Sequence, residues 1–229
     1  MELKYLFVLQ YKKGSIMTKS VIFDLDGTLL YTLEDLKDSV NFALQKFHYP
    51  PRTLDEVRNF VGNGVRLLVE RSIPNGAKNP DMEQVLKVFK AHYAENMYNK
   101  TKPFDGINEM LDELKCKGIR TAVVSNKFDL AVKELCKKYF GEKIEIAIGE
   151  SENVRKKPAP DSVLKVMEIL NCSNNETFYV GDSEVDIQTA KNCNLKCISV
   201  TWGYKNRKFL TENGAEIFVD SPDEILSYV

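Results

Sequence analysis

The sequence predicts an α/β protein: a doubly wound, Rossmann-like parallel sheet with an inserted all-helical domain. The continuous apolar run Val21–Phe23 has the pattern of a fully buried strand. From residue 103 onward, strand and helix patterns alternate, which is typical of a parallel sheet covered by helices on both faces. Residues 33–102 contain helix patterns and no convincing strand. We therefore expect a core domain over residues 17–32 and 103–229 and a helical domain over residues 33–102.

The inserted region begins with a helix whose apolar side chains recur every three or four residues. Pro50-Pro51 ends this helix, and a second amphipathic segment follows. The sequence Val61-Gly62-Asn63-Gly64 interrupts that segment before a helix resumes over residues 65–73. Asp81 is the expected N-cap of a long helix that extends to about Tyr98.

After residue 103, apolar strand segments alternate with helical segments, and Asp105 is the expected N-cap of the first helix. The predicted strands are residues 121–124, 144–148, 177–180, 197–200 and 216–219. The predicted helices are residues 106–118, 129–139, 161–170 and 185–193, with a short helix starting near Pro222.

Charge and cysteine content argue against several functional classes. The chain has 229 residues and a formal net charge of −1, so no whole-chain field favours nucleic acid or an anionic membrane. Five cysteines without a CxxC pair indicate reduced thiols in a cytoplasmic protein.

The N-terminal segment lacks the features of a secretory signal, and its apolar run Tyr5–Leu9 is too short to span a bilayer. Because Met17 offers a second start, we expect residues 1–16 to be an extension outside the core.

Two acidic residues follow the first buried strand directly. Asp24 and Asp26 stand two residues apart, and Gly27-Thr28 supplies the turn that ends the strand. Burying even one unpaired carboxylate costs several kcal/mol, on the order of 3 to 5. A buried pair therefore indicates a cation, and with it metal-assisted chemistry.

Polar residues also stand at the ends of two later strands. Ligands bind open α/β sheets beyond the carboxyl ends of the strands. There the chain places Ser125-Asn126 and Gly181-Asp182, with Lys156-Lys157 between them in sequence. Together with the first acidic pair, these side chains supply carboxylates for magnesium, donors for phosphate oxygens and a nucleophile. That combination indicates phosphoryl transfer.

These residues resemble the four motifs of the haloacid dehalogenase superfamily. The matching segments are Asp24–Leu29, Ser125-Asn126, Lys157-Pro158 and Gly181–Asp186. The helical insert stands where that superfamily carries its type 1 cap, and the resemblance covers nearly everything from Thr18 onward. Within the superfamily, Val61–Leu68 and Thr201–Tyr204 are most similar to phosphoglycolate phosphatase-like enzymes.

The resemblance implies a division of roles between the first two acids. Asp24 would attack phosphorus and form an aspartyl-phosphate, which splits the hydrolysis into two easier displacements. Asp26 would protonate the leaving alkoxide and then take a proton from the attacking water.

The resemblance also implies a set of metal and phosphate ligands. Mg²⁺ would lie between Asp24, the backbone carbonyl of Asp26 and Asp182, and Asp186 would touch a metal-bound water or orient Lys157. Donors to the phosphate oxygens would be Ser125, the backbone amide of Asn126 and Lys157. Further candidates for substrate contact are Thr28 and, in the cap, Arg66.

The implied partner is a small phosphorylated metabolite, and we expect the protein to be a monomer or a homodimer. A sugar-phosphate mutase of the β-phosphoglucomutase type uses the same motifs and stays open as an alternative. A phosphate-accepting regulatory module is disfavoured, because receiver domains are much shorter and lack a helical insert. A dehalogenase is disfavoured because those relatives do not need magnesium or the second acid.

The sequence departs from many relatives at one place after the first motif. Those relatives have an acidic residue and a serine where this chain has Tyr31-Thr32. The change affects the polar interactions expected at the hinge to the cap, and with them the range of substrates. It does not touch the expected nucleophile or metal ligands.

Overall fold

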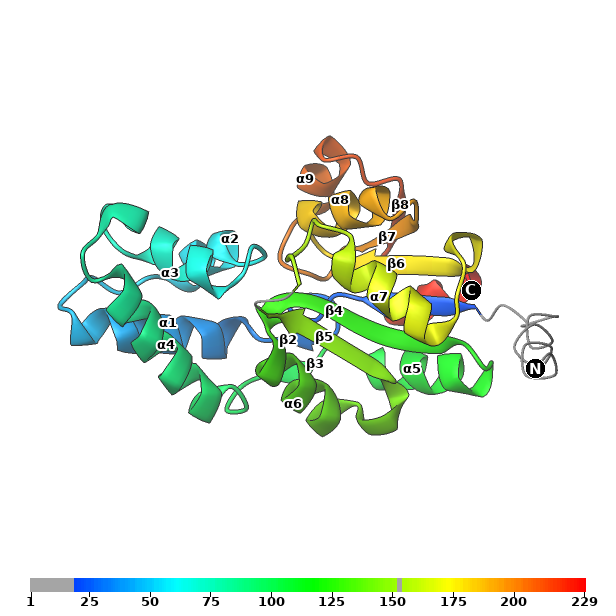
Figure 1. Ribbon diagram of the computed structural model, residues 1–229, viewed down its shortest axis with the longest axis horizontal. Helices are drawn as coiled ribbons and strands as arrows, with labels where there is room; N and C mark the ends of the chain where they lie inside the picture. The colour runs from blue at the N-terminus through cyan, green and yellow to red at the C-terminus, as the bar shows by residue number, and fades with distance from the viewer. Residues whose placement is uncertain (1–18, 152–153) are drawn as a thin grey trace, which may run out of the picture.

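The computed structural model describes residues 19–151 and 154–229, and its core is a six-stranded parallel sheet. The strands lie in the order β5-β4-β1-β6-β7-β8, so the chain starts in the middle and winds outward in both directions (Figure 1). The strands are β1 (Ser20–Phe23), β4 (Arg120–Phe128), β5 (Ile146–Glu150), β6 (Thr177–Gly181), β7 (Lys196–Val200) and β8 (Ile217–Val219). This topology confirms the predicted doubly wound fold.

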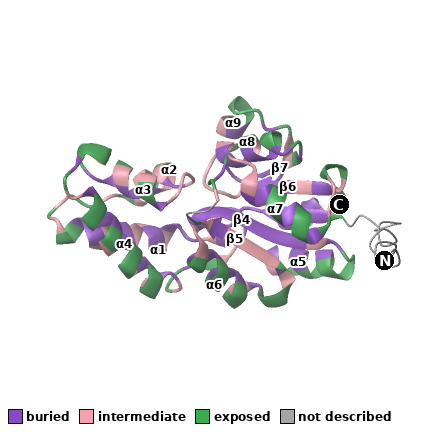
Figure 2. Cartoon of the chain, viewed as in Figure 1, coloured by how far each residue is buried: buried purple, intermediate pink, exposed green. Residues whose placement is uncertain are grey.

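Helices cover both faces of the sheet because successive strand residues point to opposite sides. Val21 and Phe23 pack with α5 (Ile107–Cys116) and α6 (Asp129–Tyr139). Ile22, between them, packs on the other face with α7 (Asp161–Leu170) and α8 (Glu184–Asn192). Central strands are buried along most of their length (Figure 2). This double burial explains why the first strand is apolar at every position.

An all-helical segment lies between two short strands, β2 (Leu30–Tyr31) and β3 (Lys102–Pro103), which pair antiparallel. Its elements are α1 (Leu33–Lys46), α2 (Leu54–Phe60), α3 (Val65–Ser72), the 3₁₀ turn η1 (Gly76–Lys78) and α4 (Met82–Asn96). We call α1 to α4 the cap. It lies beyond the carboxyl end of β1 (Figure 1).

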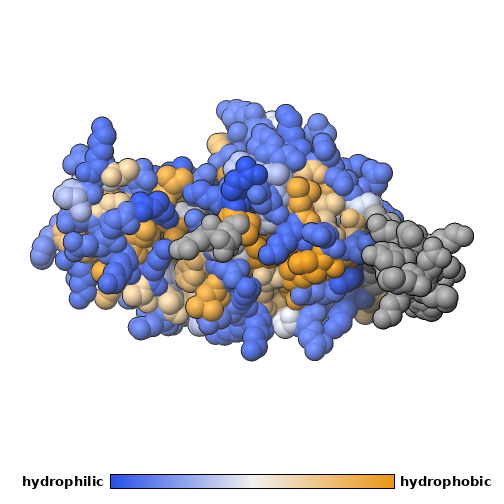
Figure 3. Space-filling model, viewed as in Figure 1, coloured by the Kyte–Doolittle hydropathy of each residue, from blue (hydrophilic) through white to orange (hydrophobic). Residues whose placement is uncertain are grey.

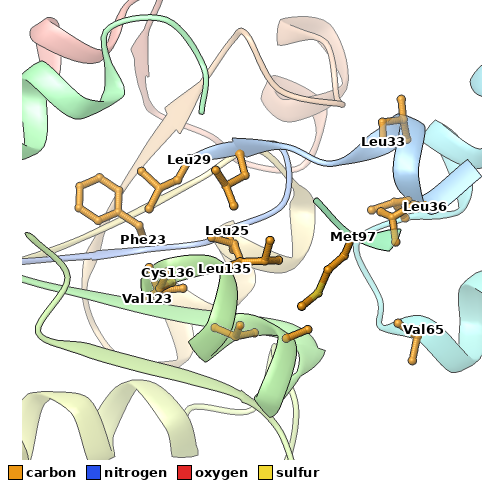
Figure 4. Packing of buried hydrophobic residues seen from close by; sticks show 14 of the residues in the cluster. Phe23, Leu25, Leu29, Leu33, Leu36, Val65, Met97, Val123, Leu135 and Cys136 are labelled. Atoms are coloured by element: carbon orange, nitrogen blue, oxygen red, sulfur yellow. The ribbon is translucent and has the colours of Figure 1, made fainter. Parts of the chain in front are cut away.

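One apolar cluster joins the cap to the sheet. Leu25 and Leu135 belong to the core, whereas Leu36 and Val65 belong to the cap, and all four are in the same buried cluster. Figure 4 shows Met97 between these two groups. The shared cluster places the cap over the loop that follows β1.

Several predicted boundaries were wrong. Asp105 does not cap α5, because Gly106 occupies the N-cap position with a left-handed φ of 83°. The strand expected at residues 144–148 starts later, at Ile146. The strand expected to end at Val124 continues to Phe128, although its pairing with β5 shifts register between these two residues. The sequence reading also missed α9 (Arg207–Glu212), a short helix without an apolar stripe that could have revealed it.

None of the helices in the described ranges is long and apolar enough to cross a bilayer. On the face shown in Figure 3, hydrophilic side chains dominate and apolar ones are interspersed among them. The extension expected at residues 1–16 lies outside the described residues.

A buried carboxylate ties the start of the cap to its end. Asp35, in the first turn of α1, is 2% exposed. It accepts hydrogen bonds from the backbone amides of Lys100 at 3.0 Å and of Thr101 at 2.8 Å. Because these amides lie just before β3, the contact closes the loop formed by the whole cap.

Removing this carboxylate should destabilise the protein. We expect Asp35→Ala to lower the free energy of unfolding by about 3 kcal/mol, because hydrogen bonds to a charged group contribute roughly 1.5–3 kcal/mol each. Asp38→Ala is the matched control, since 41% of the Asp38 side chain is exposed and it forms only partly exposed ion pairs, with Lys37 and Lys100; it should cost under about 1 kcal/mol. Urea denaturation measures both, and equal losses would contradict the role of Asp35.

Candidate active site

The loop after β1 holds the two acids at the centre of the sheet edge. The backbone amide of Asp24 still donates to Val180 in β6, at 2.9 Å, so the chain leaves the sheet only after this residue. The backbone carbonyl of Leu25 then accepts from the amides of Leu29 and Leu30, which curls the chain tightly. Gly27, at a φ of 86°, completes the turn; a Cβ there would lie 2.3 Å from Asp182 Oδ2. The turn therefore brings the first motif against the fourth.

A buried lysine lies between two of the acids. Lys157 is 3% exposed, and its Nζ lies 2.9 Å from Asp24 Oδ1 and 2.7 Å from Asp186 Oδ1. It also donates to the hydroxyl of Tyr179 at 3.0 Å. Asp24 Oδ1 accepts a second hydrogen bond, from the amide of Leu25 at 2.7 Å. The lysine therefore fixes the orientation of the Asp24 carboxylate.

Asp182 and Asp186 come from the end of β6 and the start of α8. Asp182 Oδ2 accepts from the backbone amide of Tyr204 at 2.7 Å. Asp186 forms a capping box with Ser183, because its Oδ2 accepts from both the amide and the hydroxyl of that residue. With Lys157 on Oδ1, both oxygens of Asp186 are engaged. Asp186 is therefore better placed to orient Lys157 than to bind a metal directly.

Three of the carboxylates lie close enough together to hold a metal ion. One oxygen from each of Asp24, Asp182 and Asp186 lies within 4.8 Å of the others, and all three residues are buried. Burial raises the pKa of Asp24 to about 7, although Lys157 opposes the shift. Burial, with Asp186 and Asp24 nearby, raises the pKa of Asp182 well above its usual value. Carboxylate oxygens are the ligands that Mg²⁺ prefers, so Asp24 and Asp182 suit this ion.

Ser125 and Asn126 lie in the part of β4 where its pairing with β5 shifts. Both residues line the same pocket as Asp24. The side-chain amide of Asn126 donates to the backbone carbonyl of Lys157 at 3.1 Å and to that of Gly62, in the cap, at 3.3 Å. Asn126 thus links the second and third motifs to the cap loop, and Ser125 is left facing the pocket.

A small pocket of about 30 Å³ lies between the cap and the sheet. Its core wall carries the polar groups, and its cap wall carries apolar side chains and glycines. The lining residues are Asp24, Asp26, Leu36, Val61, Gly62, Gly64, Val65, Leu68, Ser125, Asn126 and Lys127.

Asp26 has two partners that the sequence reading did not identify. The hydroxyl of Thr32 donates to Asp26 Oδ1 at 2.7 Å, and the amide of Thr32 donates to the hydroxyl of Tyr204 at 2.8 Å. Lys127 Nζ lies 2.9 and 3.0 Å from the two carboxylate oxygens. The hinge therefore keeps a polar contact despite the departure at Tyr31-Thr32. The sequence feature that could have identified Lys127 as a residue of the site is its position directly after Ser125-Asn126.

Two expected substrate contacts are not among the residues that line the pocket. Thr28 is buried within the loop that follows β1, and its backbone carbonyl accepts from the indole of Trp202 at 3.0 Å. Arg66 pairs with Glu83 on the surface of the cap, where half of its side chain is exposed. The structure therefore brings together Asp24, Asp26, Ser125, Asn126, Lys157, Asp182 and Asp186, but neither Thr28 nor Arg66 lines the pocket.

Known proteins resemble this chain in sequence and in fold. Residues 21–200 match the model of a family described as haloacid dehalogenase-like hydrolase. The phosphoglycolate phosphatase of Aquifex aeolicus is 35% identical over 193 residues, which are 80% of this chain and 85% of that protein. A crystal structure of a candidate phosphoglycolate phosphatase from Lactobacillus delbrueckii subsp. bulgaricus has a TM-score of 0.87 and 34% identity, covering 93% of this chain and 98% of that one.

One similar structure comes from a different kind of enzyme. A candidate β-phosphoglucomutase from Thermotoga maritima has a TM-score of 0.71 and 23% identity, and the match covers 92% of this chain and 97% of that chain. At this identity the likeness concerns the fold alone.

Proposed function

The chain belongs to the haloacid dehalogenase-like hydrolases and is a phosphatase, and from this we propose that it hydrolyses a small phosphorylated metabolite such as 2-phosphoglycolate with the help of Mg²⁺. The observation that carries the proposal is the buried contact of Lys157 with Asp24, in a pocket that also holds Asp26 and Ser125. A carboxylate oriented by a cation beside a potential acid is the arrangement that nucleophilic phosphoryl transfer requires.

Asp24 supplies the nucleophile. The contacts from Lys157 and from the amide of Leu25 both go to Oδ1. Oδ2 is therefore the oxygen proposed to attack phosphorus. A bond forms between Oδ2 and phosphorus while the bond to the ester oxygen breaks, which leaves an aspartyl-phosphate and an alkoxide. Lys157 balances negative charge as the phosphoryl group approaches.

Asp26 acts as the general acid and then the general base on the leaving-group side. In its protonated form it gives a proton to the departing ester oxygen, and as a carboxylate it then takes one from the water that attacks the aspartyl-phosphate. Thr32 fixes its orientation through the hydrogen bond to Oδ1. The second displacement releases inorganic phosphate and restores the Asp24 carboxylate.

The phosphate oxygens need donors and a cation. The hydroxyl of Ser125 and the backbone amide of Asn126 are proposed as donors from β4. Asp24, Asp182 and the backbone carbonyl of Asp26 are proposed to hold Mg²⁺, with Asp186 acting through Lys157. When bound, the ion would neutralise phosphate charge and polarise the phosphorus–oxygen bonds.

A mutase of the β-phosphoglucomutase type is the second candidate, because that fold is shared. A mutase must hold a sugar that carries a second phosphate during the transfer. The cap residues that line the pocket are apolar or glycine, and Arg66 pairs elsewhere. This lining favours hydrolysis of a smaller ester over isomerisation of a sugar phosphate.

An assay of purified protein with a panel of phosphorylated metabolites tests the proposal. Phosphatase activity predicts net release of inorganic phosphate that depends on added Mg²⁺ and is lost with EDTA. Isomerised sugar phosphate without net release would instead support the mutase. A protein-bound phosphate that persists for hours without turnover would support a regulatory module.

Binding of Mg²⁺ should depend on pH through the proton on Asp24. Its folded pKa of about 7 lies above the ordinary value of 3.8, so between these values the folded, metal-free protein binds a proton that the unfolded chain does not. The contribution of Asp24 to stability therefore falls as pH rises through this window. Mg²⁺ must displace the proton on Asp24, and also a proton on Asp182, whose pKa burial likewise raises. We therefore expect the affinity to rise at least about tenfold per pH unit below pH 7.

Calorimetric titration with Mg²⁺ at several pH values measures this dependence. Repeating it in buffers of different ionisation enthalpy counts the protons released. A constant affinity from pH 5 to pH 8, with no proton release, would contradict the assignment of Asp24 as a ligand.

A further inference from the structure

Lys127 is a buried cation in the pocket to which the mechanism above gives no role. It is 3% exposed and lines the same pocket as Asp24 and Asp26. We propose that Lys127 determines substrate specificity by binding an anionic group on the leaving group of the substrate. The inference rests on the proposed phosphatase function and deepens it, because it selects esters whose alcohol carries a negative charge close to the ester oxygen.

Of the described residues that line the pocket, only Lys127 carries a positive charge. Lys157 is engaged by Asp24, Asp186 and Tyr179 behind the nucleophile. The cap adds no charge of either sign to the lining. An anionic group on the leaving group would therefore find its partner on the core wall, at Lys127.

Two contacts hold the ammonium of Lys127 in place. Both oxygens of Asp26 lie within 3.0 Å of Nζ. The ring of Tyr93, from α4 of the cap, lies below it with its centroid 4.6 Å away. An ammonium has three N–H donors, so two contacts to Asp26 leave one donor for another acceptor. The contact with Tyr93 also makes the position of the cation depend on the cap.

The geometry limits how far the anionic group can be from the reacting ester. Asp26 is proposed to touch the ester oxygen, and Lys127 touches Asp26. Two successive hydrogen bonds span at most about 6 Å. The anionic group must therefore lie one or two carbon atoms from the ester oxygen, as in 2-phosphoglycolate. The apolar side chains of Leu36, Val65 and Leu68 line the space beyond and disfavour a longer polar chain.

The decisive comparison uses two substrates that differ in this charge. In 2-phosphoglycolamide, a neutral amide replaces the carboxylate of 2-phosphoglycolate with little change in shape. We expect wild-type protein to have a kcat/KM about 30- to 100-fold higher for the carboxylate, as a charged hydrogen bond would give. In Lys127→Met the two substrates should differ by less than about threefold.

The ratio of the two substrates separates recognition from a general effect on Asp26. Removing Lys127 also deprives Asp26 of a partner, which lowers turnover of both substrates but leaves their ratio unchanged. Lys127→Arg should keep part of the preference, because the charge remains. Lys156→Met is the matched control: Lys156 is exposed, contacts the carbonyl of Asn63 and is not among the lining residues. It should keep the wild-type ratio.

Each result supports or overturns the inference. Equal efficiency of wild-type protein on the two substrates overturns it, even where Lys127→Met fails to fold. So does an unchanged preference in folded Lys127→Met, or a loss of preference in Lys156→Met instead. If neither these substrates nor a wider ester panel gives phosphate release that Asp24→Asn removes, the proposed function fails and this inference fails with it.

Discussion

Replacing Asp24 with Asn should lower kcat for any phosphate ester by about 10⁴-fold or more. Asn has nearly the same shape and can still accept from the amide of Leu25, but its amide is too weak a nucleophile to attack phosphorus. Loss of the nucleophile in other enzymes costs a factor of this order. Release of inorganic phosphate measures the loss, and rapid acid quenching should show protein-bound phosphate only in the wild type.

A surface carboxylate provides the matched control. Asp55 pairs with Arg58 at the start of α2, and its side chain is 81% exposed. Asp55→Asn should therefore keep kcat within about twofold of wild type, because an exposed ion pair contributes little. Thermal unfolding of both variants shows whether each is folded. Folded Asp24→Asn protein that keeps more than a hundredth of the Mg²⁺-dependent activity would refute the assignment.

The fold was predictable because its sheet is buried on both faces. A strand that faces helices on two sides must be apolar at each position, which made Val21–Phe23 and the later strands visible in the sequence. The polar residue after each strand then had to lie at one edge, and the structure places Asp24, Ser125 and Asp182 there. Chain direction and strand ends were sufficient for that inference.

The partners of these residues could not be predicted in the same way. Asp26 binds Thr32, six residues away, and Lys127, which is 101 residues away. Such contacts depend on side-chain reach across adjacent strands and loops, which no local pattern records. Tyr179 was likewise read only as part of a buried strand, although its hydroxyl contacts Lys157. The predicted cap at Asp105 was wrong for a different reason. The turn requires a left-handed conformation at the N-cap, which the next residue, Gly106, adopts.

The helical cap was predictable as helices but not as a wall of the pocket. Arg66 follows a glycine-rich loop, and its charge suggested a contact with substrate. On α3, however, Val65 and Leu68 line the pocket, whereas Arg66 pairs with Glu83. Helical periodicity predicts which residues share a face, but it does not say which face meets the core across a hinge. Because Arg66 pairs with Glu83 outside the pocket, the cation that remains for the leaving group is Lys127 on the core wall.

Replacing Lys157 with Met should have the largest effect on stability. Burial alone would lower the pKa of Lys157, but Asp186 and Asp24 outweigh burial and hold the pKa well above its usual value. The ammonium is therefore charged at all pH values at which the protein is used. Its removal leaves buried carboxylates without a partner, so we expect the free energy of unfolding of the metal-free protein to fall by about 3–5 kcal/mol. Urea denaturation in EDTA measures this loss.

A second substitution separates loss of charge balance from loss of packing. In Lys157→Met, the buried carboxylates of Asp24 and Asp186 have lost their cation. Adding Asp186→Asn removes one of these two negative charges and should recover part of the lost stability, whereas a cavity or a clash would remain in the double variant. Lys191→Met, at an exposed position of α8, is the matched control and should unfold like the wild type. Activity should fall at least about 10³-fold in both Lys157 variants, because each lacks the cation that orients Asp24 and balances the phosphoryl charge. A single variant as stable as the wild type would mean that Lys157 does not balance the buried carboxylates.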